Sequence, residues 1–447
     1  MSDLSRRYGC SLLFLKMGEL LVIVVSSREA AEEVLKTHDA IFCSRPQMET
    51  IRSVRRRGSD IAFAPYGNEW RQLRKICILE LLSRKRVQSF RAIQEEEVTR
   101  LVQSISSAST SLVNVSKLLS AYTNDVIVSS IMGDWLIDRD TLLSYITRAH
   151  QYTQTPTMAD LFRSSRLACA LSHKMGKMDL YIESLFEFMG TIISARHPDK
   201  KTERDEANQE DIMSVLLRIQ KEGNLQFTLT LGTMKALLFD LLVAGTDTVL
   251  TIIDWAMAEL MRNPLVMSRA QSEVRRVFVE QMKVTEEGLK KLSYLHWVIK
   301  ETLRLHAPGP LLIPRESQET CRVMGYDVPK GTIVLVNAWA ISRDPEYWDE
   351  PETFKPERFE SDTRDFRGHD FEFTPFGAGR RMCPGMSFAL ASVELALANL
   401  LFHFDWNLPD VVDANELDMA KAMGFMCRRK AELWLKPIVR VPFASEN

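Results

Sequence analysis

The sequence predicts a mainly α-helical protein that folds as one large domain with a small β-sheet region. The chain has 447 residues, of which 45% are hydrophobic, so it can bury a large core. Glycine and proline are sparse, at 19 and 17 residues, and segments with helical periodicity dominate. Length alone would suggest about three domains. No segment has the composition of a linker, however, so we expect a single domain over residues 1–447.

Charge and cysteine usage exclude several classes of function. The formal net charge of -2 argues against general nucleic-acid binding. The seven cysteines are scattered without a CxxC pair, so neither a disulfide framework nor a zinc site is indicated. This pattern favours free thiols in a reducing compartment. The apolar run "ELLVIVVSS" is far too short to cross a bilayer and predicts a strand.

The N-terminal part of the chain predicts strands followed by helices. Residues 11–26 should form two short strands split by "KMGE", and "SREAAEEVLKTHDA" should form a helix capped by its serine. Residues 44–62 contain proline, arginine and glycine and predict a loop. A helix should cover 67–81, and several more should lie within 87–150.

The C-terminal part predicts longer helices around a small strand-rich section. The charged stretch 198–211 has almost no large apolar residues and predicts a solvated loop. Long helices are expected near 229–262 and 287–306, and strands within 320–337, with turns at "MGYD" and "PKGT". The last long helix should run from about 386 to 402.

The stretch "FTPFGAGRRMCPG" surrounds a single cysteine with glycines and arginines, directly before an apolar helix. Glycine permits tight turns, whose backbone N–H groups can point at an anionic sulfur. The helix starts just after Cys383, so its positive end also favours thiolate over thiol, and a thiolate is a strong iron ligand. Arg381 supplies a positive charge suited to a carboxylate, and Phe376 an apolar shield. A buried structural cysteine is the alternative.

The spacing F-x-x-G-x-R-x-C-x-G at residues 376–385 resembles the haem-binding loop of cytochrome P-450 monooxygenases, specifically the A-type class of plant microsomal enzymes. The resemblance covers nearly the whole chain. It implies that family's helical fold, with Cys383 as the axial thiolate of the iron in haem b, a ligand that favours O–O cleavage. It also implies insertion of one oxygen atom from O2 into a C–H bond, with electrons from NADPH through a reductase.

The segment "LLVAGTDTVLT" places an acid, Asp247, beside a hydroxyl, Thr248, after the helix-weakening Gly245. Such a pair can relay protons to dioxygen in a groove opened by the glycine. The alternative is a hydroxyl that bonds back to its own helix. The family pattern A-G-x-D-T, which begins at Ala244, implies the relay and makes Asp247 and Thr248 the predicted catalytic residues. Val249 stands where the family often has a second hydroxyl, so we expect it to shape the pocket.

Two further motifs carry charged residues. In "KETLRLHAP", Glu301 and Arg304 share a helix face, although surface pairs of this kind contribute little. The resemblance implies a buried network of this pair with Arg358 of "FKPERF", which holds the fold around the haem.

In "GNEWRQLRK", Trp70 and Arg74 point the same way. The resemblance implies that they contact a haem propionate, as do Arg381 and Arg315 of "IPRES", because guanidinium groups suit carboxylates. Ordinary solvated arginines are the alternative.

Several basic residues predict a docking surface for an electron donor. They occur in or just after the helix that should lie on the cysteine side of the haem, and they are Arg71, Arg74, Lys75, Arg84, Lys85 and Arg86. We expect an acidic NADPH–cytochrome reductase to dock there, with cytochrome b5 as a further donor. A merely solvated face is the alternative.

The resemblance places the protein on the cytosolic face of the endoplasmic reticulum membrane, although the anchor and proline-rich hinge of plant relatives are absent from this sequence. Residues 156–172 are expected to form a second, weaker membrane contact, but Arg163 stands where the family often has proline.

Apolar residues from four segments are expected to line a substrate pocket: Met48, Val54, Ala244, Val249, Leu312 and Phe425. They fit a small hydrophobic substrate. Family frequency favours a terpenoid, with phenylpropanoid and amino-acid-derived compounds as competitors, and an ordinary core role is the alternative for each residue.

Two other functions remain open. A haem-thiolate isomerase or dehydratase would need neither O2 nor a reductase, but the intact Asp247–Thr248 pair argues against it. A non-catalytic haem-binding or scaffold protein is the other alternative.

Overall fold

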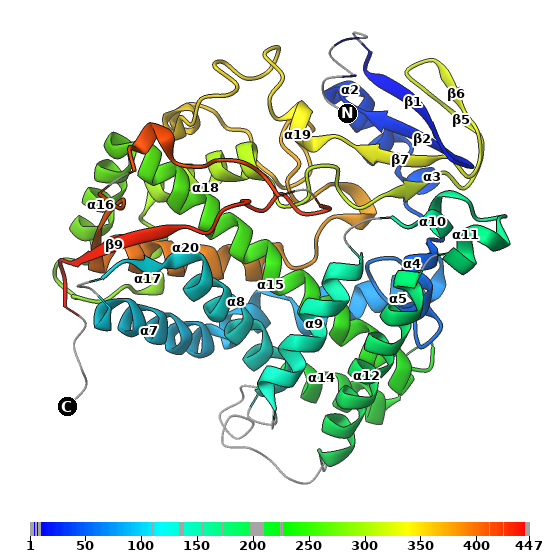
Figure 1. Ribbon diagram of the computed structural model, residues 1–447, viewed down its shortest axis with the longest axis horizontal. Helices are drawn as coiled ribbons and strands as arrows, with labels where there is room; N and C mark the ends of the chain where they lie inside the picture. Colours follow the sequence, from blue (N-terminus) through cyan, green and yellow to red (C-terminus); the bar gives the residue numbers. More distant parts are fainter. Residues whose placement is uncertain are drawn as a thin grey trace.

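A helix of 32 residues, α15 (Leu231–Arg262), lies among the other helices near the middle of the protein (Figure 1). Its sequence is apolar on most sides, so it is buried along most of its length. It contacts α8, α12, α18 and α20. The side chain of Thr230 caps its N-terminus by accepting the N–H of Thr233 at 3.1 Å. The helix expected near 229–262 is therefore confirmed.

The structure is a computed structural model that describes residues 10–108, 111–133, 138–153, 156–171, 173–196, 210–223, 227–410, 412–422 and 424–442, together with 4, 7 and 225. Its α-helices are α2 (Arg28–Glu32), α3 (Asp39–Phe42), α4 (Glu49–Arg55), α5 (Asn68–Ile76), α6 (Arg84–Ser89), α7 (Arg91–Ser107), α8 (Val115–Met132), α9 (Arg139–Thr153), α10 (Met158–Leu161), α11 (Arg166–Leu171), α12 (His173–Ala195), α14 (Ile212–Glu222), α15, α16 (Pro264–Phe278), α17 (Glu286–Leu289), α18 (Ser293–His306), α19 (Ala338–Ile341) and α20 (Met386–His403). Single turns of other helix types are η1 (Glu33–Thr37), η2 (Cys77–Leu81), η4 (Pro356–Glu360), η5 (Gly379–Arg381) and η6 (Ala414–Glu416).

The strands form three small sheets, of which the largest lies at one corner of the molecule (Figure 1). In that sheet β1 pairs with β2 antiparallel, β2 with β7 parallel, and β7 with β4 antiparallel. A second hydrophobic core lies under it, separate from the main core among the helices. The strands are β1 (Leu12–Met17), β2 (Leu20–Val25), β3 (Val113–Asn114), β4 (Arg315–Glu316), β5 (Cys321–Val323), β6 (Tyr326–Val328), β7 (Ile333–Val336), β8 (Phe404–Asn407) and β9 (Trp434–Val439).

Most of the elements expected from the sequence are present, with two corrections. The loop predicted over 44–62 contains the helix α4, because Ile51 and Val54 are buried, at 8% and 4% exposure, and α4 packs on α9 and α12. The helix predicted over 287–306 is divided into α17 and α18, since the backbone of Leu292 leaves the helical region. The charged loop predicted over 198–211 lies, up to residue 209, outside the described residues.

Within the described part of the chain, α15 and α20 are long and apolar enough to span a membrane by length and composition. Each is mostly buried inside the protein, over 61% and 72% of its most apolar window. We therefore interpret both as core helices.

Candidate haem-thiolate site

The loop around Cys383 is closed by its own backbone. The N–H of Cys383 donates to the carbonyl oxygen of Phe376 at 2.9 Å. Gly377 and Gly379 have φ values of 70° and 69°, a region that favours glycine. The ring of Phe376 packs edge-on against Phe366, with 5.4 Å between the centroids. The tight turns expected around the cysteine are therefore present.

The thiol of Cys383 lies where this loop meets α20, and it is accessible to solvent. The surrounding protein raises the pKa of the thiol by desolvation. The backbone N–H groups of Gly385 and Met386, together with the cation of Arg74, act in the opposite direction. Hydrogen-bond donors and positive charge stabilise a thiolate. An accessible sulfur oriented by two N–H groups fits the proximal ligand of a haem iron.

Four arginines gather beside the loop, and burial is the first cause of a lowered pKa in each: Arg45, Arg74, Arg315 and Arg381. The pKa of Arg381 falls to about 10, and the cations of Arg315 and Arg74 contribute to that fall. Such crowding of buried positive charge favours an anion among the guanidinium groups. The carboxylates of a haem are anions of this kind, so the cluster fits the predicted propionate residues.

Two of these arginines also fasten the loop to the rest of the protein. Arg74 of α5 donates to the carbonyl oxygen of Met382 at 2.5 Å. Arg315 of β4 donates to the carbonyl oxygen of Ala378 at 2.8 Å. A guanidinium has five N–H donors, so these contacts do not exhaust either side chain.

Arg381 and Trp70 meet at the chain segment before α5. The indole N–H of Trp70 donates to the carbonyl oxygen of Ile61 at 3.0 Å, and its ring lies 3.9 Å from the guanidinium carbon of Arg381. Arg381 donates to three carbonyl oxygens, those of Cys43, Ile61 and Ala64. Both side chains therefore organise the chain beside the loop, and their propionate role stays a prediction.

Two buried residues of this cluster were not predicted from the sequence. Asp39 accepts from Arg315 and from Arg380, each at 2.9 Å, and so provides a carboxylate among the arginines. Arg45 donates to the carbonyl oxygen of Ile313 at 2.7 Å. Neither lies in a periodic motif, and the only signal was an arginine placed directly before a proline in "CSRPQ".

The predicted relay lies on an open face of α15. Ala244 is exposed and Thr248 is half-buried one turn later. The hydroxyl of Thr248 donates to the carbonyl oxygen of Ala244 at 2.6 Å, which leaves its oxygen as an acceptor. The carboxylate of Asp247 forms an ion pair with Arg428. The structure therefore shows the back-bond considered as the alternative, while the catalytic role of both residues stays a prediction.

Gly245 lies against α8. A Cβ at Gly245 would lie only 2.5 Å from Cδ1 of Ile127 in α8. The glycine therefore permits the close packing of α8 on α15, and the groove expected beside it stays a prediction.

The six predicted pocket residues fall into two groups. Val54 and Val249 are packed in the main core, at 4% and 1% exposure, as the core alternative requires. The others are at least partly open: Met48, Ala244, Leu312 and Phe425. A polar cavity of about 270 Å³ lies between α8, α15 and residues 428–432, and none of the six lines it.

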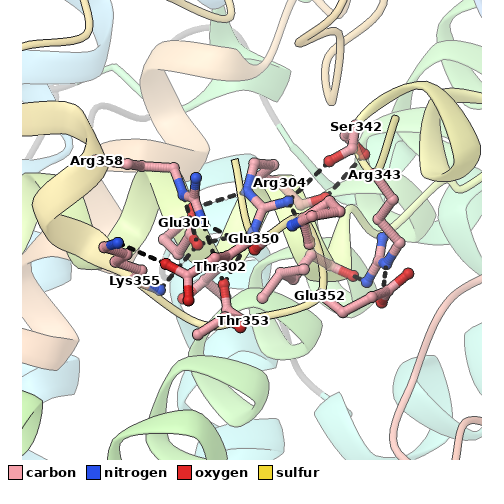
Figure 2. Close-up of polar contacts among 12 residues, drawn as sticks. Glu301, Thr302, Arg304, Ser342, Arg343, Glu350, Glu352, Thr353, Lys355 and Arg358 are labelled. Atoms are coloured by element: carbon pink, nitrogen blue, oxygen red, sulfur yellow. Dashed lines mark hydrogen bonds and ion pairs between the residues drawn. The ribbon is translucent and has the colours of Figure 1, made fainter. Parts of the chain in front are cut away.

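The predicted scaffold network is present, and its central pair is buried (Figure 2). Glu301 and Arg304 are 0% exposed and form a bidentate pair, with two N···O distances of 2.8 Å. Arg358 donates to the same carboxylate at 3.0 Å, and so does the backbone N–H of Lys355 at 2.9 Å. Arg304 also donates to the carbonyl oxygen of Ser342 at 2.8 Å. The three charged residues thus join α18 to the segment before the cysteine loop.

A pair of buried carboxyl groups holds the segment between α4 and α5. Asp240 of α15 accepts the N–H groups of Ile61 and Ala62. Asp60 accepts the N–H groups of Phe63 and Ala64. Burial raises the pKa of both groups, and the charge of Asp60 raises that of Asp240 further. Oδ2 of Asp60 has no hydrogen-bond partner in the structure. A proton on this atom would remove the repulsion.

Because both folded pKa values are raised, the pair stabilises the fold fully at low pH, and this contribution is lost as pH rises through those values. We expect Asp60→Asn, whose amide replaces the proton, to flatten the fall in unfolding free energy as pH rises above about 4, the ordinary pKa of an aspartate. Chemical denaturation at several pH values measures this. In the matched variant Asp160→Asn, stability should fall instead, because both oxygens of this buried carboxylate accept hydrogen bonds: Oδ2 accepts the N–H of Thr157 and Oδ1 that of Thr50. If the unfolding free energy fell equally steeply with rising pH in wild type and in Asp60→Asn, the shared proton would be excluded.

Comparisons with known proteins show the family to which the chain belongs. The sequence matches the family model described as Cytochrome P-450 over residues 1–434. It is 44% identical to desmethyl-deoxy-podophyllotoxin synthase of Sinopodophyllum hexandrum, over 98% of this chain and 86% of the relative. It is also 44% identical to dolabradiene monooxygenase of Zea mays, over 100% and 88%. Premnaspirodiene oxygenase of Hyoscyamus muticus is 42% identical, over 97% and 86%.

A solved structure shows the same architecture. A zebrafish cytochrome P-450 determined with abiraterone superposes with a TM-score of 0.81 at 25% identity, and the match covers 98% of each chain. The chain therefore belongs to the cytochrome P-450 family and has its fold.

Proposed function

We propose that the protein uses O2 and electrons that a reductase takes from NADPH to oxidise a small hydrophobic plant metabolite. As a cytochrome P-450 with relatives named as monooxygenases, it is an oxidoreductase that incorporates oxygen. The observation that carries the proposal is the accessible thiol of Cys383, oriented by two N–H groups beside a cluster of buried arginines. The test is the carbon monoxide difference spectrum of the reduced protein, followed by turnover.

Each predicted site residue has its own role in this proposal. Cys383 binds the iron of haem b, which supplies the chemistry of oxygen activation when bound. Phe376 shields the sulfur. Arg74, Arg315 and Arg381, with Trp70, orient the propionates, and the crowding of their buried charges supports this role. Asp247 holds and passes protons toward Thr248 on the open face of α15.

Thr248→Ala should keep haem binding and lose coupling. We expect product per NADPH to fall by at least about tenfold, with reducing equivalents released as peroxide, because positioned proton transfer contributes about 10²–10⁴-fold to a rate. Thr251→Val is the matched control, since the hydroxyl of Thr251 makes the same kind of back-bond, to the carbonyl oxygen of Asp247 at 2.7 Å. Equal coupling in wild type and Thr248→Ala would exclude the relay.

Terpenoids are the substrate class to test first. The relatives include proteins named for dolabradiene and premnaspirodiene, and the open pocket residues Met48, Leu312 and Phe425 are apolar. Relatives named as tabersonine 16-hydroxylases make other hydrophobic secondary metabolites the second class. A panel of both, assayed for NADPH-dependent product, discriminates between them. Turnover without NADPH would favour the isomerase alternative.

We further propose that the reductase docks on the basic surface around α5 and α6, with cytochrome b5 as a second donor. Arg71, Lys75, Arg84 and Lys85 are exposed there. Arg74 and Arg86 point inward, and Arg86 donates to the backbone carbonyl oxygen of Glu210 at 3.0 Å. The proposed docking surface therefore comprises only the four exposed cations. Attraction between such a surface and an acidic partner weakens with salt.

The location we propose is the cytosolic face of the endoplasmic reticulum membrane. Its support is a set of apolar side chains that are all 44–68% exposed: Phe14 and Leu21 of the first strands, and Met158 and Leu167 of α10 and α11. The turn between the strands is joined to α10, because the N–H of Glu19 donates to a carbonyl of that helix at 2.8 Å. The contact expected at 156–172 would therefore include the strands.

A further inference from the structure

Two consecutive arginines near the C-terminus face two acids of α15. Arg428 forms an ion pair with Asp247, and Nη1 of Arg429 lies 3.9 Å from Oδ2 of Asp254. The two acids are seven residues apart, which is two helical turns, so they lie on one side of α15. Residues 428 and 429 thus lie alongside the helix that carries the predicted relay, and each arginine pairs with one of its acids.

The backbone of this segment is held independently of its charges. The N–H of Cys427 donates to the carbonyl oxygen of Pro308 at 2.8 Å, and the indole N–H of Trp255 donates to the carbonyl oxygen of Cys427 at 2.6 Å. The carbonyl of Arg428 accepts the N–H of Ala422 at 2.9 Å. The backbone of Arg428 is therefore held in place by contacts that do not depend on its ion pair with Asp247.

The two ion pairs have different surroundings. Asp254 accepts the hydroxyl of Ser116 at 2.5 Å and is buried at 7% exposure, so its pair with Arg429 is part of the packed structure. The side chains of Asp247 and Arg428 are 18% and 34% exposed. Arg428 also lines the polar cavity of about 270 Å³, which reaches Thr251 one turn beyond Asp247. Asp254 and Arg429 line the same cavity, but the larger exposure of Asp247 and Arg428 lets water approach their pair more readily.

We propose that Arg428 is a positioning residue for proton delivery: it holds the carboxylate of Asp247 ionised and oriented at the edge of the polar cavity. From there Asp247 takes a proton that solvent delivers and passes it toward Thr248; this second transfer regenerates the carboxylate, which the arginine again stabilises as an ion pair. A fork-shaped, permanently charged guanidinium suits this task better than a flexible ammonium group. The inference rests on the relay role of Asp247 and Thr248 in the proposed function.

The direct contact is tested in the haem-loaded protein by thermal unfolding of Arg428→Gln, Asp247→Asn and the double variant. We expect each single variant to lower the unfolding midpoint and the double variant to lower it by less than the sum. Arg322→Gln, which removes an arginine from the exposed pair with Asp327, is the matched control and should leave the midpoint unchanged. Additive shifts for Arg428 and Asp247 would overturn the proposal.

The consequence for catalysis is tested by coupling and its pH profile. In Arg428→Gln, product per NADPH should fall at least about fivefold with haem content unchanged, and the loss should change with pH as Asp247 is no longer held ionised. Arg428→Lys should restore part of the coupling, which a merely structural role would not predict. If Thr248→Ala uncouples the enzyme and Arg428→Gln does not, this inference fails alone. If neither uncouples it, the proposed relay fails with it.

Discussion

Cys383→Ala is expected to abolish the red-shifted Soret band that reduced wild-type protein should show with carbon monoxide. Cys383 is an exposed residue of the loop, and two backbone N–H groups are directed at its sulfur, whereas an alanine offers no ligand in its place. Turnover should fall below detection, the largest functional effect of any single change that we predict. Far-UV circular dichroism shows whether the variant remains folded.

The matched control for this experiment is Cys169→Ala, because Cys169 is also exposed but lies in α11, away from the loop. This variant should keep the band and the turnover. A thiolate band retained by Cys383→Ala, in folded protein, would require another cysteine as the iron ligand and would exclude the site proposed above. Absence of the band from folded wild-type protein would favour the scaffold alternative.

Glu301→Gln should produce the largest loss of stability. The carboxylate neutralises two buried guanidinium groups, those of Arg304 and Arg358, and it accepts a backbone N–H as well. An amide accepts through only one oxygen, carries no charge, and would direct its NH2 group at an arginine. Removal of one partner from a buried ion pair costs about 3–5 kcal/mol. Urea denaturation measures this loss as a lower unfolding midpoint, and poor accumulation of soluble protein should accompany it.

An exposed pair supplies the comparison for that variant. Glu286 pairs with Lys290 at 3.0 Å across one helical turn on the surface. Glu286→Gln should change the unfolding free energy by no more than about 1 kcal/mol, because solvent screens such a pair. If Glu301→Gln changed the unfolding free energy as little as this, the network would not stabilise the fold. Other contacts would then hold the haem site in position.

The motifs with short spacing could be predicted from the sequence because each is built by one local element. The turn around Cys383 and the pair of Glu301 with Arg304 belong to a loop and to a single helix, so their spacing already specifies their geometry. The joining of Arg358 to that pair was implied by the family resemblance, and the structure shows it at 3.0 Å. The long helix α15 could also be predicted from its apolar periodicity.

The contacts missed from the sequence join distant segments without a local pattern. Asp240 and Ile61 are 179 residues apart, and the ion pair of Arg428 with Asp247 spans a comparable separation. Neither spacing nor composition selects such partners, since each depends on how whole helices pack. The short helix α4 was missed for a related reason, because burial against α9 and α12 overrides the loop-like composition of its surroundings.

The contact of the cysteine loop with the start of the chain sets the order in which the protein can be completed. A Cβ at Gly379 would lie 2.3 Å from the carbonyl oxygen of Leu35, and the N–H of Arg380 donates to Asp39 across 341 residues. The segment that packs behind the cysteine loop therefore leaves the ribosome more than 300 residues before the loop does. Haem capture must follow the synthesis of both segments, so a nascent protein stalled before the loop has no proximal site, however well its earlier helices have folded.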